Sequence, residues 1–456
     1  MKQLQRLSAF VLCLGAFMSG LDLFIVNIAL PDIARDFART DLSGLSWALN
    51  AYTIVFAALL VPAGRWADAI GRKRAFLLGL GLFAVASALC AAAPSVGLLV
   101  AARVVQATGA ALLLPTSLAL LMPLFPAERR SIVVAMWAAV SGVAAAAGPP
   151  VGGLLVELSW RWVFLVNVPV GIVALLVGAR VLREAREPAP TPPDVPGAVL
   201  LAAGMAALVG GIVQGPGWGW GDARVLGAFA LAAVLLGLVA LRSVRHPAPV
   251  IDPALLRVRS FAVATGSAVV FFAGFGAMLL SSVLLLTGPF GQSVLRAGLE
   301  IAPGPAMAAL LSVPGARLAQ RVGMAAVGVL GTALFTVSAL WWHSRLGGSF
   351  DYAGGFLPGM LLGGAGVGCV IPTVTGAAAA SLPPARLATG TALVTTARQL
   401  GLAVGVAVVV ALLGAGRSVA DFDPVYVFIA ATSVVSGLGL AALGQVAAPA
   451  AEPVAA

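Results

Sequence analysis

The sequence VPAGRWADAIG (residues 61–71) is followed 252 residues later by a related one, VPGARLAQRVG (residues 313–323). The two copies are identical at five of eleven positions. An internal repeat at so long a spacing indicates a chain that is built from two related halves.

The composition is typical of a protein that crosses a membrane many times. Hydrophobic residues make up 61% of the 456 positions and charged residues only 10%, whereas a soluble domain has about 25% charged residues. A transmembrane helix needs about 20 mostly apolar residues. Fourteen stretches are long and apolar enough, at residues 8–30, 45–63, 75–93, 97–121, 132–156, 162–181, 196–214, 225–241, 261–287, 297–314, 325–342, 355–380, 387–413 and 425–446.

The spacing of the repeat indicates where extra helices enter. At the average length per span, 252 residues hold eight spans rather than the six of a simple duplication. We therefore expect two inserted helices, at 196–214 and 225–241, which follow a Pro-rich linker (residues 183–197) whose composition disfavours a helix. The expected fold is all-α, with two six-helix halves and a two-helix central insert. Its three parts are an N-terminal six-helix bundle, the linker with the inserted helices, and a C-terminal six-helix bundle, at residues 1–182, 183–245 and 246–456.

The net charge of +10 is explained by membrane topology rather than by binding to nucleic acid. Short cytoplasmic loops collect Lys and Arg, and most basic residues of this chain fall in such loops if the N-terminus is inside. An even number of spans then places both termini in the cytoplasm. Arg far outnumbers Lys, which favours a bacterial source and hence the bacterial cytoplasmic (inner) membrane.

A polytopic membrane enzyme is the less favoured alternative. Such an enzyme needs a nucleophile or general base clustered at one membrane face, but His246 and His343 fall on opposite sides in the expected topology. The sequence has no P-loop for ATP, and its Cys and His residues lack metal-ligand spacing. We expect no enzymatic activity, no metal and no cofactor.

The loop after the second span contains GRWADAIGRKR (residues 64–74). This stretch resembles the signature of the loop between helices 2 and 3 in the major facilitator superfamily. Almost the whole chain resembles the fourteen-helix drug:proton antiporters of that superfamily. The resemblance implies the major facilitator fold and a conformational latch at Gly64, Asp68, Gly71 and Arg72. We expect Asp68 to accept hydrogen bonds from N–H groups at a neighbouring helix N-terminus, and the latch to break when the transporter opens inward.

Two further motifs carry the resemblance. RVVQATGAA (residues 103–111) is similar to the helix-4 motif of the superfamily, and GVAAAAGPPVGG (residues 142–153) resembles the helix-5 motif of its exporters. Small residues allow helices to approach closely, and prolines remove backbone donors and favour a kink. The second motif therefore predicts export and a hinge at Gly148, Pro149, Gly152 and Gly153.

Asp22 lies inside the first apolar stretch. A carboxylate at membrane depth costs about 3 kcal/mol on insertion scales, so a retained one indicates a function. At a rise of 1.5 Å per residue, Asp22 and Arg103 both lie roughly 9 to 12 Å below the outer surface, and a buried guanidinium needs a partner. We expect the two residues to form a proton-responsive centre: the ion pair favours the carboxylate, exclusion of water favours the neutral acid, and protonation frees Arg103.

The substrate cavity is expected at the membrane midplane, between the two halves. Its candidate lining residues are polar, charged or aromatic side chains on the bordering spans: Asn27, Trp47, Asn50, Tyr52, Gln106, Arg398 and Gln399. Such a lining suits amphipathic, drug-like molecules. Outside the cavity, Glu300 and Arg296 are four residues apart near an outer helix end. We expect them to form a surface ion pair, with a cation-handling role for Glu300 as the alternative.

These patterns predict a monomeric transporter that exports drug-like or antibiotic molecules by alternating access, with the proton gradient as its energy source. Its expected partners are the small-molecule substrate, protons and the lipid bilayer. The alternative within the same fold is an importer or uniporter of a small metabolite.

Overall fold

The computed structural model describes residues 2–38, 40–126, 130–186, 191–347, 349–382, 386–414 and 418–443. Over these residues the chain is helical and contains no strand. The first half consists of α1 (Lys2–Asp36), α2 (Leu42–Ile70), α3 (Arg72–Ala92), α4 (Val96–Leu121), α5 (Arg130–Leu158), the short α6 (Trp162–Leu165) and α7 (Asn167–Val181). The later helices are α8 (Val195–Trp218), α9 (Ala223–Arg245), α10 (Pro253–Leu256), α11 (Arg259–Thr287), α12 (Val294–Ile301), α13 (Pro303–Val322), α14 (Met324–Arg345), α15 (Leu357–Ala380), α16 (Leu387–Leu413) and α17 (Asp423–Ala441).

Thirteen helical segments among the described residues are long and apolar enough to cross a membrane. They coincide with thirteen of the fourteen predicted spans. The remaining predicted span, 132–156, falls on α5, whose described apolar part is Gly142–Leu158. Two spans consist of two helices each, α6 with α7 and α12 with α13. The chain is therefore a multi-pass membrane protein with the predicted all-α fold.

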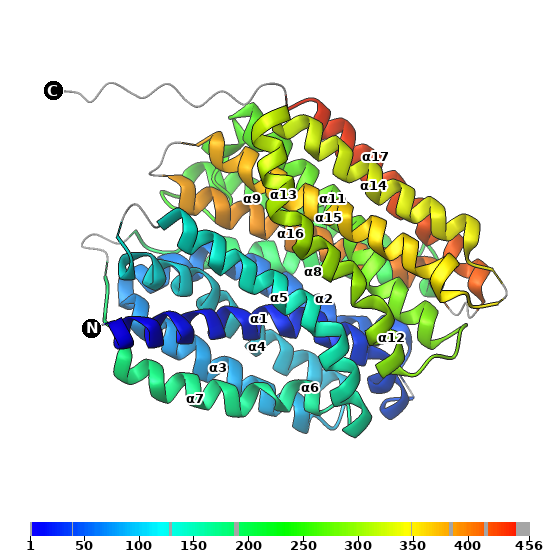
Figure 1. Ribbon diagram of the computed structural model, residues 1–456, viewed down its shortest axis with the longest axis horizontal. Coiled ribbons are helices and arrows are strands. Elements are labelled where there is room, and N and C mark those ends of the chain that lie inside the picture. The colour runs from blue at the N-terminus through cyan, green and yellow to red at the C-terminus, as the bar shows by residue number, and fades with distance from the viewer. Residues whose placement is uncertain are drawn as a thin grey trace.

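The two halves lie side by side, with the blue and cyan helices of the first half below the yellow and red helices of the second in Figure 1. Within the first half α3 and α2 pack on α4, and α1 packs on α5; within the second half α14 and α13 pack on α15, and α11 packs on α16. The halves meet where α2 packs against α16 and where α5 packs against α12 and α13. The functional site lies close to the first of these contacts.

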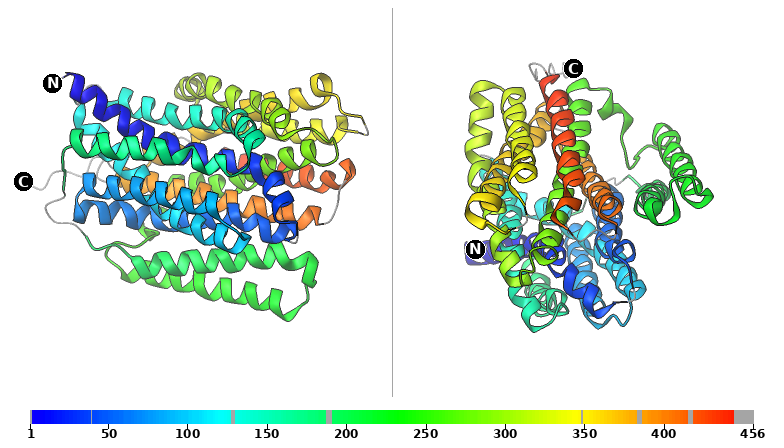
Figure 2. Two further views of the ribbon diagram at one scale, coloured as in Figure 1. Left: turned by 90° about the horizontal axis from the view of Figure 1, so that it is seen from below. Right: turned by 90° about the vertical axis from the view of Figure 1, so that its right-hand side faces the viewer.

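The inserted helices form a hairpin outside the two bundles. α8 and α9 cover the predicted spans 196–214 and 225–241 and pack against each other, and α8 also packs on α2 and α16. Figure 2 shows the pair in green beside the rest of the molecule. Asp194 begins α8, where its Oδ1 accepts the Gly197 N–H at 2.9 Å and the Nε of Arg242 at 2.5 Å. Residues 187–190 of the predicted linker lie outside the described residues.

The sequence repeat produces the same turn in both halves. Gly71 joins α2 to α3 with φ 108° and ψ 131°, and Gly323 joins α13 to α14 with φ 98° and ψ 147°. Each glycine donates its N–H to the residue four positions earlier, at 2.9 and 3.0 Å. Residues with a side chain rarely adopt this conformation, which explains why glycine ends both copies of the repeat.

Candidate functional site

Asp22 of α1 and Arg103 of α4 form a buried ion pair between Asp22 Oδ2 and Arg103 Nη1. Their side chains are 0% and 1% exposed. The pairing predicted from their equal depths is therefore present. Removing two charges from water costs several kcal/mol per ion, and an ion pair repays this cost only when further hydrogen bonds satisfy the remaining polar atoms.

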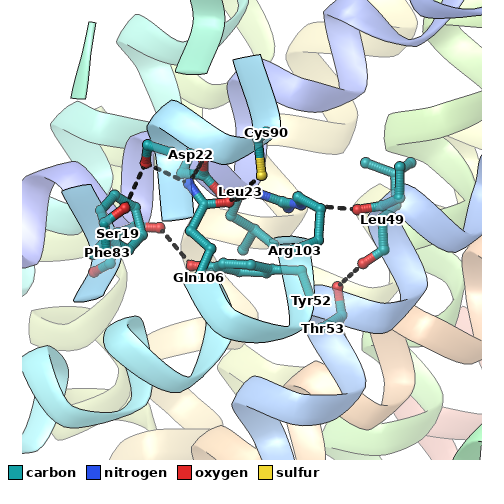
Figure 3. A network of polar contacts seen from close by, with 12 residues as sticks. Ser19, Asp22, Leu23, Leu49, Tyr52, Thr53, Phe83, Cys90, Arg103 and Gln106 are labelled. Atoms are coloured by element: carbon teal, nitrogen blue, oxygen red, sulfur yellow. Dashed lines mark hydrogen bonds and ion pairs between the residues drawn. The ribbon is translucent and has the colours of Figure 1, made fainter. Parts of the chain in front are cut away.

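Gln106 and the α2 backbone supply those hydrogen bonds (Figure 3). Gln106 Nε2 donates to Asp22 Oδ1 at 2.8 Å and to Ser87 Oγ of α3 at 2.9 Å, and its Oε1 accepts from Arg103 Nη1 at 2.6 Å. Arg103 Nε donates to the Ala48 carbonyl of α2 at 2.9 Å. One network thus joins α1, α2, α3 and α4. The sequence placed Gln106 at the substrate cavity, and its position three residues after Arg103 was the available sign that both side chains share a helix face.

Tyr52 belongs to the same network. Its ring lies below the Arg103 guanidinium, with 4.1 Å between the guanidinium carbon and the ring centroid, and its hydroxyl donates to the Ser19 carbonyl at 3.4 Å. A desolvated cation–π contact contributes on the order of 2 kcal/mol. Tyr52 was predicted to line the substrate cavity, but in this conformation it is fully buried against the ion pair.

A small cavity of about 20 Å³ lies between the halves, beside the ion pair. Residues of α1, α2 and α4 line it from one half and residues of α11 and α16 from the other: Leu23, Asn27, Leu49, Thr53, Arg103, Gly276, Leu279, Leu402 and Val406. The volume has room for about one water molecule, whereas a drug-sized ligand needs roughly 300 Å³ or more. A drug-sized molecule would therefore fit here only if the halves separate.

The other predicted cavity residues lie in different environments. Asn27 lines the cavity, and its Oδ1 has no hydrogen-bond partner among the described residues. Asn50 is fully buried, and both polar atoms of its side chain lack such a partner. Trp47 lies beside Gly210 of α8. On α16, Gln399 is buried, and Arg398 lies with its guanidinium carbon 4.6 Å from the centroid of the Phe272 ring.

The predicted latch residues lie at the turn between α2 and α3. Asp68 Oδ1 accepts from Arg72 Nε at 2.8 Å, which bridges the turn at Gly71. The expectation that Asp68 receives the N–H groups of a helix N-terminus is wrong for α3 in this conformation, because Glu184 takes that position. Its carboxylate accepts from the N–H groups of Lys73 at 3.0 Å and Arg74 at 3.4 Å. No pattern in the linker indicates that Glu184 returns to α3.

Gly64, the first of the predicted latch residues, packs beside Pro115 of α4. A Cβ at Gly64 would lie 3.7 Å from the nearest Pro115 atom, which is an ordinary packing distance. The contact between α2 and α4 therefore has room for a Cβ at Gly64, and the role of this glycine in a latch stays a prediction.

The predicted hinge positions are points of close packing in this conformation. α5 runs as one helix through Pro149. Gly148 and Gly152 face α1, and Gly153 faces α12, where a Cβ would lie 2.7 Å from the Leu295 Cα. These residues therefore let α5 press against α1 and α12. Bending at this point stays a prediction.

The prediction for Glu300 was wrong in one respect. Its Oε1 pairs with Arg296 Nε at 2.9 Å as expected, but the Glu300 side chain is only 9% exposed, against 62% for Arg296. Its Oε2 is buried without a hydrogen-bond partner among the described residues. The pair is therefore only half at the surface, because α12 packs against α5.

Comparison with known proteins places this geometry in a family. Residues 12–406 match the profile of the Major Facilitator Superfamily. The chain is 36% identical over 334 residues to the tetracenomycin C resistance and export protein of Streptomyces glaucescens. This alignment covers 73% of the present chain but only 62%, less than two thirds, of the Streptomyces protein. It is 32% identical over 427 residues to the multidrug resistance protein Stp of Mycobacterium tuberculosis (strain CDC 1551 / Oshkosh), which covers 93% and 78% of the two chains. A solved peptide transporter in complex with sulfate has the same fold, with a TM-score of 0.71 at 15% identity over 96% of this chain and 95% of that one.

Proposed function

Because this chain belongs to the Major Facilitator Superfamily, we propose that it exports drug-like or antibiotic molecules across the bacterial cytoplasmic membrane in exchange for protons. Relatives that match over most of the chain are named for drug resistance or export, which favours export over the import of a metabolite. The chain is a transporter and not an enzyme.

The observation that carries the proposal is the buried network of Asp22, Arg103 and Gln106. Asp22 is the member on α1, whereas Arg103 and Gln106 are on α4 and Ala48 is on α2. A proton on Asp22 removes the charge that attracts Arg103. Arg103 keeps its bonds to Ala48 and Gln106, so protonation loosens α1 while α2 and α4 stay joined.

The network also touches the space that a substrate would occupy. Arg103 lines the small cavity between the halves, and so does Asn27, which lies on α1 about one turn from Asp22. A molecule in this space would contact the guanidinium whose bonding depends on the protonation of Asp22. This shared residue gives proton binding and substrate binding a direct route to influence each other.

Alternating access then requires the parts at residues 1–182 and 246–456 to rock against each other. The contacts that must break lie at the present interface: Thr396 Oγ1 of α16 donates to the Ala57 carbonyl of α2 at 3.0 Å, and Gly153 of α5 packs on Leu295 of α12. The Asp68–Arg72 pair and Glu184 hold the turn at the cytoplasmic end of α2. The protein acts as a monomer with both termini in the cytoplasm.

Growth and dye-efflux assays in an efflux-deficient bacterial host test the function. Cells that express the protein should resist at least one antibiotic or cationic or anionic dye, and a protonophore should abolish this resistance. Resistance to a single compound would indicate a self-protection exporter, and broad resistance a multidrug pump. No effect on any compound, together with protonophore-independent uptake of a nutrient, would contradict the proposal and favour the importer or uniporter.

A further inference from the structure

Two arginines within membrane-spanning helices, Arg103 and Arg398, differ in how their charge is neutralised. Arg103 pairs with Asp22, and further hydrogen bonds surround the pair. Arg398, near the middle of α16, makes no ion pair or hydrogen bond with any described residue, and its Nε is buried. Its guanidinium instead makes a cation–π contact with the ring of Phe272. An unpaired guanidinium inside a membrane is costly, and a cation–π contact offsets only part of that cost.

The position of Arg398 relates it to the space between the halves. Arg398, Leu402 and Val406 are spaced by four residues on α16, so they lie on one face of the helix. Leu402 and Val406 line the cavity between the halves. On α11, Phe272 precedes the cavity-lining Gly276 by the same interval. Arg398 and Phe272 therefore lie one turn away from the cavity wall.

The interface is closed beside Arg398 in this conformation. Thr396, two residues earlier on α16, bonds to the Ala57 carbonyl of the opposite half. Separation of the halves would break this bond and widen the cavity toward the guanidinium. Arg398 thus lies where a substrate enters contact with the second half when the protein opens.

The charges around this space leave one positive charge unmatched among the described residues. Asp22 and Arg103 neutralise each other, and Arg398 remains. A guanidinium offers five N–H donors in a planar fork, which matches a carboxylate or a similar oxygen anion. The cavity wall one helical turn from Arg398 is mainly apolar, with Leu23, Leu279 and Leu402 among its residues. The site therefore combines one unmatched cation with an apolar surface.

We propose that Arg398 is a substrate-binding residue and that the exported molecules carry an anionic oxygen group, such as a carboxylate or phenolate, on an apolar body. The proposal rests on the export function proposed above and adds the charge of the substrate. A cationic compound of the same shape would be repelled by the same guanidinium.

Binding measurements with two dyes that share a xanthene ring system test this proposal. Fluorescein supplies the anion and rhodamine 123 the cation, and the affinity of the purified protein in lipid nanodiscs for each dye is measured at neutral pH. The wild type should bind fluorescein more tightly. Arg398→Gln should weaken fluorescein binding by about tenfold or more, as expected for one lost charge-assisted hydrogen bond, without weakening rhodamine 123. Arg398→Lys, which keeps the charge but loses the fork, should fall in between.

Arg245→Gln is the matched control, because Arg245 is an exposed arginine at the end of α9. Fluorescein binding to Arg398→Gln at the level of this control, or an equal loss for both dyes, would overturn the proposal. If Arg398→Gln fails to fold, a wild-type preference for rhodamine 123, or unchanged binding in Arg398→Lys, would overturn it. Binding in nanodiscs needs no proton gradient, so it tests the role of Arg398 separately from export. Charge-selective binding without protonophore-sensitive efflux in cells would contradict the export function and leave the role of Arg398 in binding intact.

Discussion

Gln106 Nε2 donates to Oδ1 of Asp22 at 2.8 Å, while Arg103 binds Oδ2 of the same carboxylate. Both oxygens of Asp22 are therefore held by α4, and α1 follows this helix as long as the carboxylate is charged. The proposed proton coupling depends on this arrangement.

Gln106→Leu should lower the rate of proton-driven export by about tenfold. The substitution removes the donor to Oδ1 of Asp22, and a buried polar group left unpaired costs about 1–3 kcal/mol. Efflux of an exported compound from cells, normalised to protein in the membrane, measures the change. Thr108→Ala, on the same helix and outside the network, is the control. Equal rates for the two variants would show that Gln106 does not hold Asp22.

Asp68→Asn should reduce export severalfold without reducing insertion into the membrane, because the amide loses the charge that pairs with Arg72 across the turn at Gly71. A partly exposed ion pair such as this one is worth on the order of 1 kcal/mol or less, so the effect should appear in transport rather than in stability. Asp222→Asn likewise removes the carboxylate charge from an ion pair, that of Asp222 with Arg224 in the inserted hairpin, and should leave export unchanged. Wild-type export from Asp68→Asn would refute the latch.

Gly153→Ala should disturb the contact between the halves. Its Cβ would lie 2.7 Å from the Leu295 Cα, a backbone atom of α12, so one helix must shift. In Gly142→Ala, on the same helix, the Cβ would lie 3.7 Å from the Cβ of Ala309, which is an ordinary packing distance. A cysteine introduced near α12 should therefore react faster with a water-soluble maleimide in Gly153→Ala than in Gly142→Ala. Equal reactivity would contradict the role of this contact in closure.

Acid should weaken the attachment of the inserted hairpin at Asp194. Burial alone would raise the pKa of Asp194, but hydrogen bonds from Arg242 and the Gly197 N–H outweigh it and hold the pKa below its ordinary value. A lowered pKa stabilises the folded state above the unfolded value of about 3.9, and this stability is lost as the pH falls through the folded value. The difference in melting temperature between wild type and Asp194→Asn should therefore be largest near neutral pH and shrink below about pH 4. A difference independent of pH would contradict this account.

Much of the fold follows from the sequence because length and hydropathy determine a membrane span. The repeat that ends at Gly71 and Gly323 also indicated the two halves and the inserted hairpin. Depth along a helix can be counted in residues, and this was enough to pair Asp22 with Arg103. The spans that consist of two helices were read as single ones, because a break such as that before Pro303 leaves the apolar pattern intact.

Lateral packing could not be predicted in the same way. Gln106 shares the Arg103 face of α4, a sign that was passed over, whereas nothing in the sequence states which side of α2 faces α4. Gln106 and Tyr52 were therefore placed at the substrate cavity instead of around the ion pair. Glu184 comes after the first six spans and is far from α3 in the sequence. Its contact with the start of α3 arises only when the chain folds, so it could not be predicted. The burial of Glu300 likewise depends on α5, a helix that is distant in sequence.

Proton movement in proteoliposomes shows whether Asp22 carries the coupled proton. Vesicles that contain the purified protein and an internal pH dye are given a compound that the cell assays identify as exported. Wild type and Asp222→Asn should move protons against the flow of the compound. Asp22→Asn should still bind the compound but move no protons above the level of empty vesicles. Proton movement at the wild-type rate in Asp22→Asn would contradict the account.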